Sequence, residues 1–264
     1  MSGSKLQTRS RRVRGWRLRR ILAIVAVLAL CGGAGYFAVH ESRDPRFFAV
    51  ADRVTGGEQT SRADIVAALD LPPDANAWLL DRRALRGRVE RLPWIASARV
   101  AVRWPNKVDV AVVERRPSAI VVCGSQQGEE PSARYALIDD TQRVLAIAAN
   151  PQLIGGAALP LVLVTPPPAA ASPGETLADK SVTQALQAGR DLNALGVHVS
   201  EIAIAPATGI SATADRHLRV LFGENEELAE KARVFQAIVA KIAQPERIAY
   251  IDVRSVRAPT VLYR

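Results

Sequence analysis

The most constraining feature of this chain is a run of 19 residues, Ile21–Val39, that contains no charged side chain. As an α-helix this run would be about 28 Å long, which is close to the thickness of the hydrocarbon core of a bilayer. We therefore predict a transmembrane helix over residues 21–39, with Ile21 and Val39 at its two ends.

The charge distribution orients this predicted helix. The chain has 35 basic and 26 acidic residues, and eight of the basic ones fall within residues 1–20, which contain no acid. Positive charge concentrates on the cytoplasmic side of a span, so we expect residues 1–20 in the cytoplasm and everything after residue 39 outside it. The rest of the chain is nearly neutral, which argues against a nucleic-acid partner and makes the lipid bilayer the expected neighbour of the tail.

Two alternatives to an uncleaved anchor are a cleaved signal peptide and a lipoprotein signal. Leu28-Ala29-Leu30-Cys31 resembles a lipobox, but Leu30 stands where a small residue is needed. The surroundings of Ala34-Gly35-Tyr36 offer a poor cleavage site. With an uncleaved anchor, Cys31 lies inside the membrane and Cys123 outside it, so the two cysteines cannot pair within one chain.

Residues 48–117 alternate between strand and helix signals. A strand ends at Gly56-Gly57, Ser61 opens a first helix and Asp81 opens a second one, because small polar side chains cap helix N-termini. Two strands with alternating valines follow, on either side of Pro105-Asn106. The predicted order is therefore β-α-α-β-β, in which two helices on one face of a small sheet bury a single core.

Three short motifs of this segment have a specific spacing: Leu92-Pro93-Trp94-Ile95-x-Ser97-Ala98, Arg103-Trp104-Pro105 and Glu114-Arg115-x-Pro117. In these motifs and their order the segment resembles the POTRA domain of the FtsQ/DivIB family of bacterial cell-division proteins. We expect Pro93 to end a helix, Trp94 to fill the gap between helices and sheet, and Pro105 to set the hairpin.

Residues 118–264 are predicted to form a second domain. Helices are expected at Ser181–Leu195 and Asn225–Ile242, which keep apolar residues at helical spacing. Strands are expected at Ser118–Cys123, Tyr135–Asp139, Arg143–Ala148, Leu159–Val164, Val199–Ala205, Gly209–Ala214, Leu218–Phe222, Ile248–Val253 and Val261–Tyr263. Leu137-Ile138-Asp139 and Ile251-Asp252-x-Arg254 resemble motifs of the β-domain that follows the POTRA domain in the same family.

The expected fold class is therefore α+β. A basic tail over residues 1–20 precedes the transmembrane helix of residues 21–39, and residues 40–47 form a juxtamembrane connector. The POTRA domain then spans residues 48–117. A mixed β-domain of antiparallel strands with two flanking helices spans residues 118–264.

Signatures of enzymatic chemistry are missing from the sequence. His40, His198 and His217 lie in no metal-binding pattern, and no Gly-x-Ser-x-Gly or phosphate-binding glycine motif occurs. An exported hydrolase would have to use Cys123 with one of the last two histidines. Asp139-Asp140 is expected at a solvated hairpin tip rather than in a cation site. We therefore expect a protein that is not an enzyme, without cofactor, metal or small-molecule substrate.

The resemblance implies a divisome scaffold of the cell inner membrane, with its globular domains in the periplasm at the division septum. In the family, the last strands of the β-domain receive FtsB, which travels with FtsL. The stretch that matches here supplies the expected partner-binding residues Arg254, Ser255, Arg257, Val261, Leu262 and Tyr263. Tyr263 stands at the position of an aromatic contact residue, and the arginines suit acidic partner residues. Ser255 replaces an aromatic residue of the family, and Pro259 removes a backbone donor from the expected edge.

Other interpretations stay open at this point. The C-terminal stretch is equally well an ordinary closing strand of the sheet. Arginines along the second POTRA helix form a solvated face or a docking surface for an acidic partner or anionic headgroups. A POTRA-type scaffold for envelope protein assembly or secretion is the alternative function, and other divisome proteins are expected to contact the POTRA domain and the transmembrane segment.

Overall fold

The computed structural model describes residues 8–42, 44–124, 134–154, 159–214 and 217–264 of the 264-residue chain. The chain divides into two compact units, and each is described by itself. The first unit comprises Met1–Thr55, Arg62–Arg88 and Ala98–Ala111, and the second comprises Gly56–Ser61, Val89–Ser97 and Val112–Arg264.

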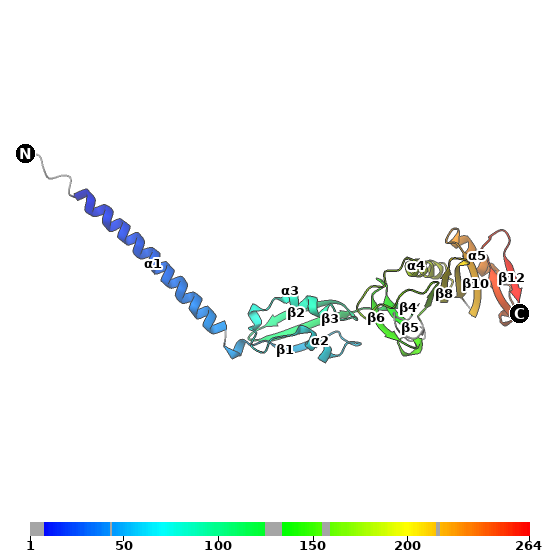
Figure 1. Ribbon diagram of the computed structural model, residues 1–264, viewed down its shortest axis with the longest axis horizontal. Coiled ribbons are helices and arrows are strands. Elements are labelled where there is room, and N and C mark those ends of the chain that lie inside the picture. The colour runs from blue at the N-terminus through cyan, green and yellow to red at the C-terminus, as the bar shows by residue number, and fades with distance from the viewer. Residues whose placement is uncertain (1–7, 43, 125–133, 155–158, 215–216) are drawn as a thin grey trace, which may run out of the picture. The chain divides into compact units, whose positions relative to one another are not determined.

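A long N-terminal helix, α1, runs from Thr8 to Ser42 and encloses the predicted span (Figure 1). Apolar side chains are exposed along it, among them Leu22, Leu30 and Phe37. The side chains of Ile21 and Val39, which mark the predicted ends of the span, lie outside the described residues. Within the described part of the chain, no helix has the length and apolarity that crossing a membrane requires.

The β-α-α-β-β order predicted for residues 48–117 is confirmed. After a 3-10 turn at Pro45–Phe47, the elements are β1 (Val50–Thr55), α2 (Arg62–Leu69), a 3-10 turn at Ala77–Leu79, α3 (Arg82–Val89), β2 (Ile95–Arg103) and β3 (Lys107–Glu114). Within the described residues these strands form a three-stranded sheet in the order β1-β3-β2, with β1 parallel to β3.

Local chemistry explains the elements of the first unit. The Asp81 carboxylate accepts the backbone N–H groups of Arg83 at 2.9 Å and Ala84 at 3.1 Å, so it caps α3 as predicted. Ile65 and Leu69 of α2 are fully buried. Leu85 of α3 and alternate residues of β3 are buried as well, which places the core of this unit between its helices and its sheet.

The second unit contains most of the remaining elements, and the strands predicted for it are present to within two residues. They are β4 (Pro117–Cys123), β5 (Arg134–Asp139), β6 (Val144–Ala148), β7 (Leu161–Val164), β8 (Val199–Ala205), β9 (Gly209–Ala214), β10 (Leu218–Gly223), β11 (Ile248–Asp252) and β12 (Thr260–Tyr263). The helices are α4 (Lys180–Ala194) and α5 (Leu228–Val239), with 3-10 turns at Pro151–Leu153 and Pro245–Arg247. The helix α5 is shorter than predicted at both ends, and at its N-terminal end Glu227 adopts a left-handed conformation that keeps the helix from starting earlier.

The strands of the second unit form one mixed sheet, which has nine strands within the described residues, in the order β12-β11-β10-β9-β8-β7-β4-β5-β6. Hairpins make β4–β5, β5–β6, β8–β9, β9–β10 and β11–β12 antiparallel, as expected. The expectation of antiparallel strands is wrong for β4–β7, β7–β8 and β10–β11, which are parallel. For β7–β8 and β10–β11 the reason is topological, since α4 connects β7 to β8 and α5 connects β10 to β11, and a helical crossover returns the chain in the same direction.

Both helices of the second unit cover the same face of its sheet (Figure 1). Buried residues of α4 and α5 share one apolar cluster with alternate residues of the strands, and Phe222 packs edge-on against Phe235 with ring centroids 6.3 Å apart. On the opposite face, Ile120, Leu137 and Leu145 form a smaller cluster that Trp94 packs against. Trp94 therefore covers the nine-stranded sheet instead of filling the gap between the POTRA helices and their sheet, as the motif had suggested.

We expect Gly209→Ala to destabilise the chain. Gly209 has a φ of +65°, and an added Cβ would lie 2.5 Å from the carbonyl carbon and oxygen of Gly223. The combined conformational and steric cost should lower the free energy of unfolding by about 2 kcal/mol. Urea unfolding followed by circular dichroism measures this. Gly189→Ala is the matched control, because this helical glycine has space for a Cβ and the change should stabilise α4 by about 0.5–1 kcal/mol. Equal stability of both variants would contradict the prediction.

Candidate binding surfaces

The C-terminal strand β12 lies at one end of the nine-stranded sheet. It pairs antiparallel with β11, with Tyr250 opposite Leu262 and Ile251 opposite Val261. Because β12 is the last strand in the order, its other side offers backbone groups to an additional strand. Pro259 immediately precedes β12, so all four residues of the strand keep their backbone N–H donors.

The side chains of β12 divide between the core and the surface. Val261 is half-buried against the main apolar cluster of the second unit. Leu262 is 49% exposed and Tyr263 is 64% exposed, which is high for large apolar side chains in a strand. Two exposed anchors on an open edge are the kind of feature that a partner strand covers.

A shallow groove of about 430 Å³ lies beside this edge. It is lined by Ile238 near the end of α5, by residues that follow this helix, by Arg247 before β11, and by Val261 and Tyr263 of β12. Lys241 and Arg247 are both exposed in its wall, so the groove joins an apolar floor to positive charge. Such a groove suits a segment that presents an apolar side chain next to a carboxylate.

The predicted partner-binding arginines are placed differently from one another. The guanidinium of Arg254 contacts the Asp252 carboxylate at 2.6 Å, and this hydrogen bond lowers the pKa of Asp252 and raises that of Arg254. Arg254 is therefore already engaged within its own chain. Ser255 and Arg257 are exposed in the loop between β11 and β12.

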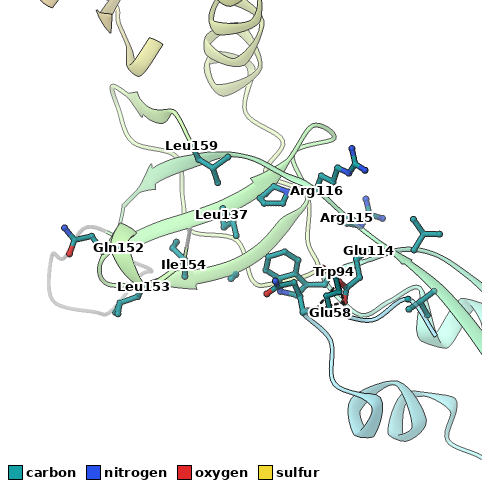
Figure 2. Close-up of a pocket in the computed structure, with 16 residues that line it drawn as sticks. Glu58, Trp94, Glu114, Arg115, Arg116, Leu137, Gln152, Leu153, Ile154 and Leu159 are labelled. Carbon is teal, nitrogen blue, oxygen red and sulfur yellow. Dashed lines mark hydrogen bonds between the residues drawn. The ribbon is translucent and has the colours of Figure 1, made fainter. Parts of the chain in front are cut away.

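A second and larger pocket, of about 810 Å³, lies on the face of the sheet opposite the helices (Figure 2). Leu137, Ile154 and Leu159 form its apolar wall, and Trp94 lies across from them beside Glu114 (Figure 2). All of its lining residues belong to the second unit.

The carboxylate at this pocket has a structural task. Glu114 accepts backbone N–H groups from Glu58, Gln59 and Thr60 at 2.8–3.0 Å. Burial alone would raise the pKa of Glu114, but these three donors outweigh burial and lower it. The side chain is thus a fixed anion that holds the loop after β1, and it is poorly suited to donate a proton at neutral pH.

Asp139 is the most deeply buried acid among the described residues, with 2% of its surface exposed. Its carboxylate contacts Arg115 Nη1 at 2.7 Å and accepts hydrogen bonds from the Thr141 hydroxyl at 2.7 Å and the Arg143 backbone N–H at 2.9 Å. The expectation of a solvated Asp139-Asp140 tip is therefore wrong for Asp139, whereas Asp140 is exposed. The turn folds back because the buried carboxylate needs its neighbours' donors.

The same contacts determine the pKa of Asp139. Burial acts to raise this pKa, and the hydrogen bonds from Thr141, Arg115 and Arg143 lower it by more, so that the value lies below that of an ordinary aspartate. Asp139 is therefore ionised at neutral pH, with both carboxylate oxygens engaged by hydrogen-bond donors of its own chain.

The residues proposed for a hydrolase do not form a reactive site. Cys123 is 1% exposed, and burial raises the pKa of its thiol to about 11, so that the nucleophilic thiolate is scarce at neutral pH. His198 and His217 are exposed. Across the part of the chain that the structure describes, no cluster of three His, Cys, Asp or Glu side chains is arranged to hold a metal ion.

We expect Asp139→Asn to lower the free energy of unfolding by about 3 kcal/mol, because it leaves the Arg115 guanidinium, 18% exposed, without its counter-charge. Asp140→Asn is the matched control at an exposed neighbour and should change stability by less than about 0.5 kcal/mol. Chemical denaturation of both variants measures the difference. Similar stabilities of the two variants would show that the buried pair of Asp139 and Arg115 does not stabilise the fold.

The lowered pKa of Asp139 also predicts a pH dependence. Its stabilising contribution is present above the unfolded-state pKa of about 3.9 and is lost as the pH falls through the lower folded-state pKa. Thermal unfolding between pH 7 and pH 3 should therefore show the wild-type advantage over Asp139→Asn shrinking below about pH 4. An advantage that stayed constant over this range would contradict the role of the charge.

Comparison with known proteins agrees with these elements. A family model described as POTRA domain, FtsQ-type, matches residues 53–115, and one described as cell division protein FtsQ/DivIB, C-terminal, matches residues 130–254. The FtsQ-type match distinguishes this POTRA segment from those of other envelope scaffolds.

Curated relatives point the same way. The chain is 34% identical over 119 residues to the cell division protein FtsQ of Syntrophotalea carbinolica, which covers 43% of this chain and 42% of that protein. It is 35% identical over 80 residues to that of Myxococcus fulvus, covering 30% and 28% of the two chains. The matches thus span less than half the length of these two relatives. A third, from Anaeromyxobacter sp., is 27% identical over 266 residues, covering 94% and 84%. With both family models matched in order along one chain, this protein belongs to the FtsQ/DivIB family of bacterial cell-division proteins.

Proposed function

We propose that the chain is a division scaffold, anchored in the inner membrane by α1, that recruits FtsB together with FtsL through the open edge of β12. The single observation that carries the partner site is the exposure of Leu262 and Tyr263 on a strand with a free side, next to a groove that contains Lys241 and Arg247. A partner strand added there gains backbone hydrogen bonds from β12 and covers both side chains.

The edge of β12 and the groove beside it contribute differently to partner recognition. Backbone pairing along β12 supplies affinity that is independent of sequence, whereas the groove selects a partner that places an apolar residue and an acid near Tyr263. Both arginines of the predicted set are exposed, and Arg257 is the better candidate for an acidic partner residue because Arg254 already contacts Asp252. Polar rim charges of this kind chiefly raise the association rate.

The anchor rests on the charge-free segment 21–39, on the eight basic residues before it and on the apolar side chains exposed along α1. With the basic tail in the cytoplasm, the residues that follow α1 lie in the periplasm, where FtsB and FtsL would meet β12. No catalytic residue is needed for this role, because holding partners together at the septum is a binding function.

Binding of the purified FtsB–FtsL pair tests the partner site. Tyr263→Ala should weaken binding about tenfold or more, as expected for loss of an aromatic anchor at the centre of an interface. Leu153→Ala is the matched control, because Leu153 is 76% exposed on the second unit but contributes nothing to β12 or its groove. If Tyr263→Ala and a chain ending before Ser255 both bind as well as the wild type, the partner site is elsewhere.

Imaging tests the cellular role. A fluorescent protein fused to the N-terminus should accumulate at mid-cell, and depletion of the native copy should produce filaments, because septation stalls without its scaffold. Protease added to spheroplasts should digest residues beyond α1 and spare the tail. Uniform envelope fluorescence with normal septation would overturn the division role and favour a scaffold for envelope protein assembly.

A further inference from the structure

Three large apolar side chains at one end of the first unit are exposed instead of packing in its core. Trp104 is 75% exposed, Leu79 is 74% exposed and Trp78 is 45% exposed. The indole N–H of Trp78 donates to the backbone oxygen of Pro105 at 2.9 Å, which ties the 3-10 turn at Ala77–Leu79 to the turn between β2 and β3. We call Trp78, Leu79 and Trp104 the aromatic tip.

The aromatic tip belongs to the end of the sheet at which the chain arrives from α1. The Val50 N–H donates to the Asn106 oxygen at 3.0 Å, and Phe48 forms a β-bridge with Asn76. Seven residues lie between the end of α1 at Ser42 and Val50, a tether that spans at most about 28 Å. The short connector therefore keeps the aromatic tip close to the point where α1 would leave the membrane.

Charge near the aromatic tip is mainly positive once internal contacts are considered. Arg82 and Arg83 are exposed at the start of α3, a few residues after Leu79. Of the carboxylates nearest in sequence, Asp81 caps α3 and Asp52 accepts from Arg103 at 2.6 Å, whereas Asp74 is exposed. The surface thus combines indole rings with guanidinium groups, the pairing that favours the headgroup region of an anionic bilayer.

We propose that the aromatic tip inserts into the outer leaflet of the same bilayer that α1 crosses, with Arg82 and Arg83 on anionic headgroups. This inference rests on the proposed anchor. An indole ring prefers the membrane interface because its flat apolar body and its polar edge are both satisfied there. The short tether keeps the tip at a high effective concentration near the surface, so that a weak intrinsic affinity suffices. Docking would hold the POTRA sheet at a defined height and orientation on the membrane.

Quenching of single tryptophans by brominated lipids tests the proposal on the full chain. The four tryptophans are Trp16, Trp78, Trp94 and Trp104, and variants that retain one each, with phenylalanine at the other three positions, report on separate places. We reconstitute them in vesicles of phosphatidylglycerol and brominated phosphatidylcholine. Trp104 and Trp78 emission should be strongly quenched, whereas Trp94, packed on the nine-stranded sheet, should lose no emission. Circular dichroism verifies that each variant is folded.

The outcomes separate the tip from the anchor. Washing the vesicles with alkaline carbonate tests the anchor separately, because it removes proteins that do not span the bilayer. If the chain resists this extraction but Trp104 emission is as little quenched as that of Trp94, the docking of the tip is overturned and the anchor stands. Chains that carbonate extracts would overturn the anchor and the docking together. A Trp104 blue shift that grows with the protein-to-lipid ratio, without quenching by bromine, would assign the tip to a second copy or another protein and overturn lipid docking.

A second set of variants tests whether Arg82 and Arg83 bind anionic headgroups. In the variant that retains Trp104, the double change Arg82→Gln/Arg83→Gln should reduce quenching in vesicles with phosphatidylglycerol and leave it unchanged in pure phosphatidylcholine. The change Arg190→Gln, at an exposed arginine of α4, is the matched control and should have no effect in either lipid. Equal quenching of the double variant and the control would remove the headgroup role from Arg82 and Arg83.

Discussion

The second unit depends on a buried ion pair between Asp139 and Arg115. Arg115 follows β3, and it also donates to the backbone oxygen of Ile95 at 3.1 Å, while Asp139 ends β5. The Asp139 carboxylate therefore links the end of β5 to Arg115, and Arg115 in turn contacts Ile95 at the start of β2. Burying this pair costs desolvation free energy, so its benefit is a defined arrangement of these segments more than net stability.

From β4 the sheet extends to β12 through two helical crossovers and several hairpins. Because α4 and α5 both lie on one face, that face is closed by apolar packing, and among the described residues Trp94, Ile154 and Leu159 pack on the opposite face near β4–β6. Strand order then leaves β12 at the far end. The candidate partner edge is thus a consequence of topology: a sheet that grows by addition and does not close into a barrel must end in an edge.

Much of the fold was predictable from local signals. The spacing of apolar residues, the caps at Ser61 and Asp81, and the glycine after α4 placed most helices and strands within two residues, because these signals act over a few neighbouring positions. Gly196, the glycine after α4, has a φ of +81°, a conformation that ends a helix and that glycine adopts readily. The parallel pairings were missed, since strand direction depends on where the chain returns after a helix, and a hydrophobic pattern carries no such information.

The candidate site shows the same division. The sequence alone determined that the chain has a charge-free N-terminal segment, two globular regions in a recognisable order and an apolar C-terminal strand with an aromatic residue. Tertiary structure decided that Asp139 is buried, that Trp94 packs on the larger sheet, that Arg254 is held by Asp252, and that Trp104 is exposed. Burial and pairing depend on contacts between residues far apart in the chain, and two sequences with the same local pattern can differ in every one of them.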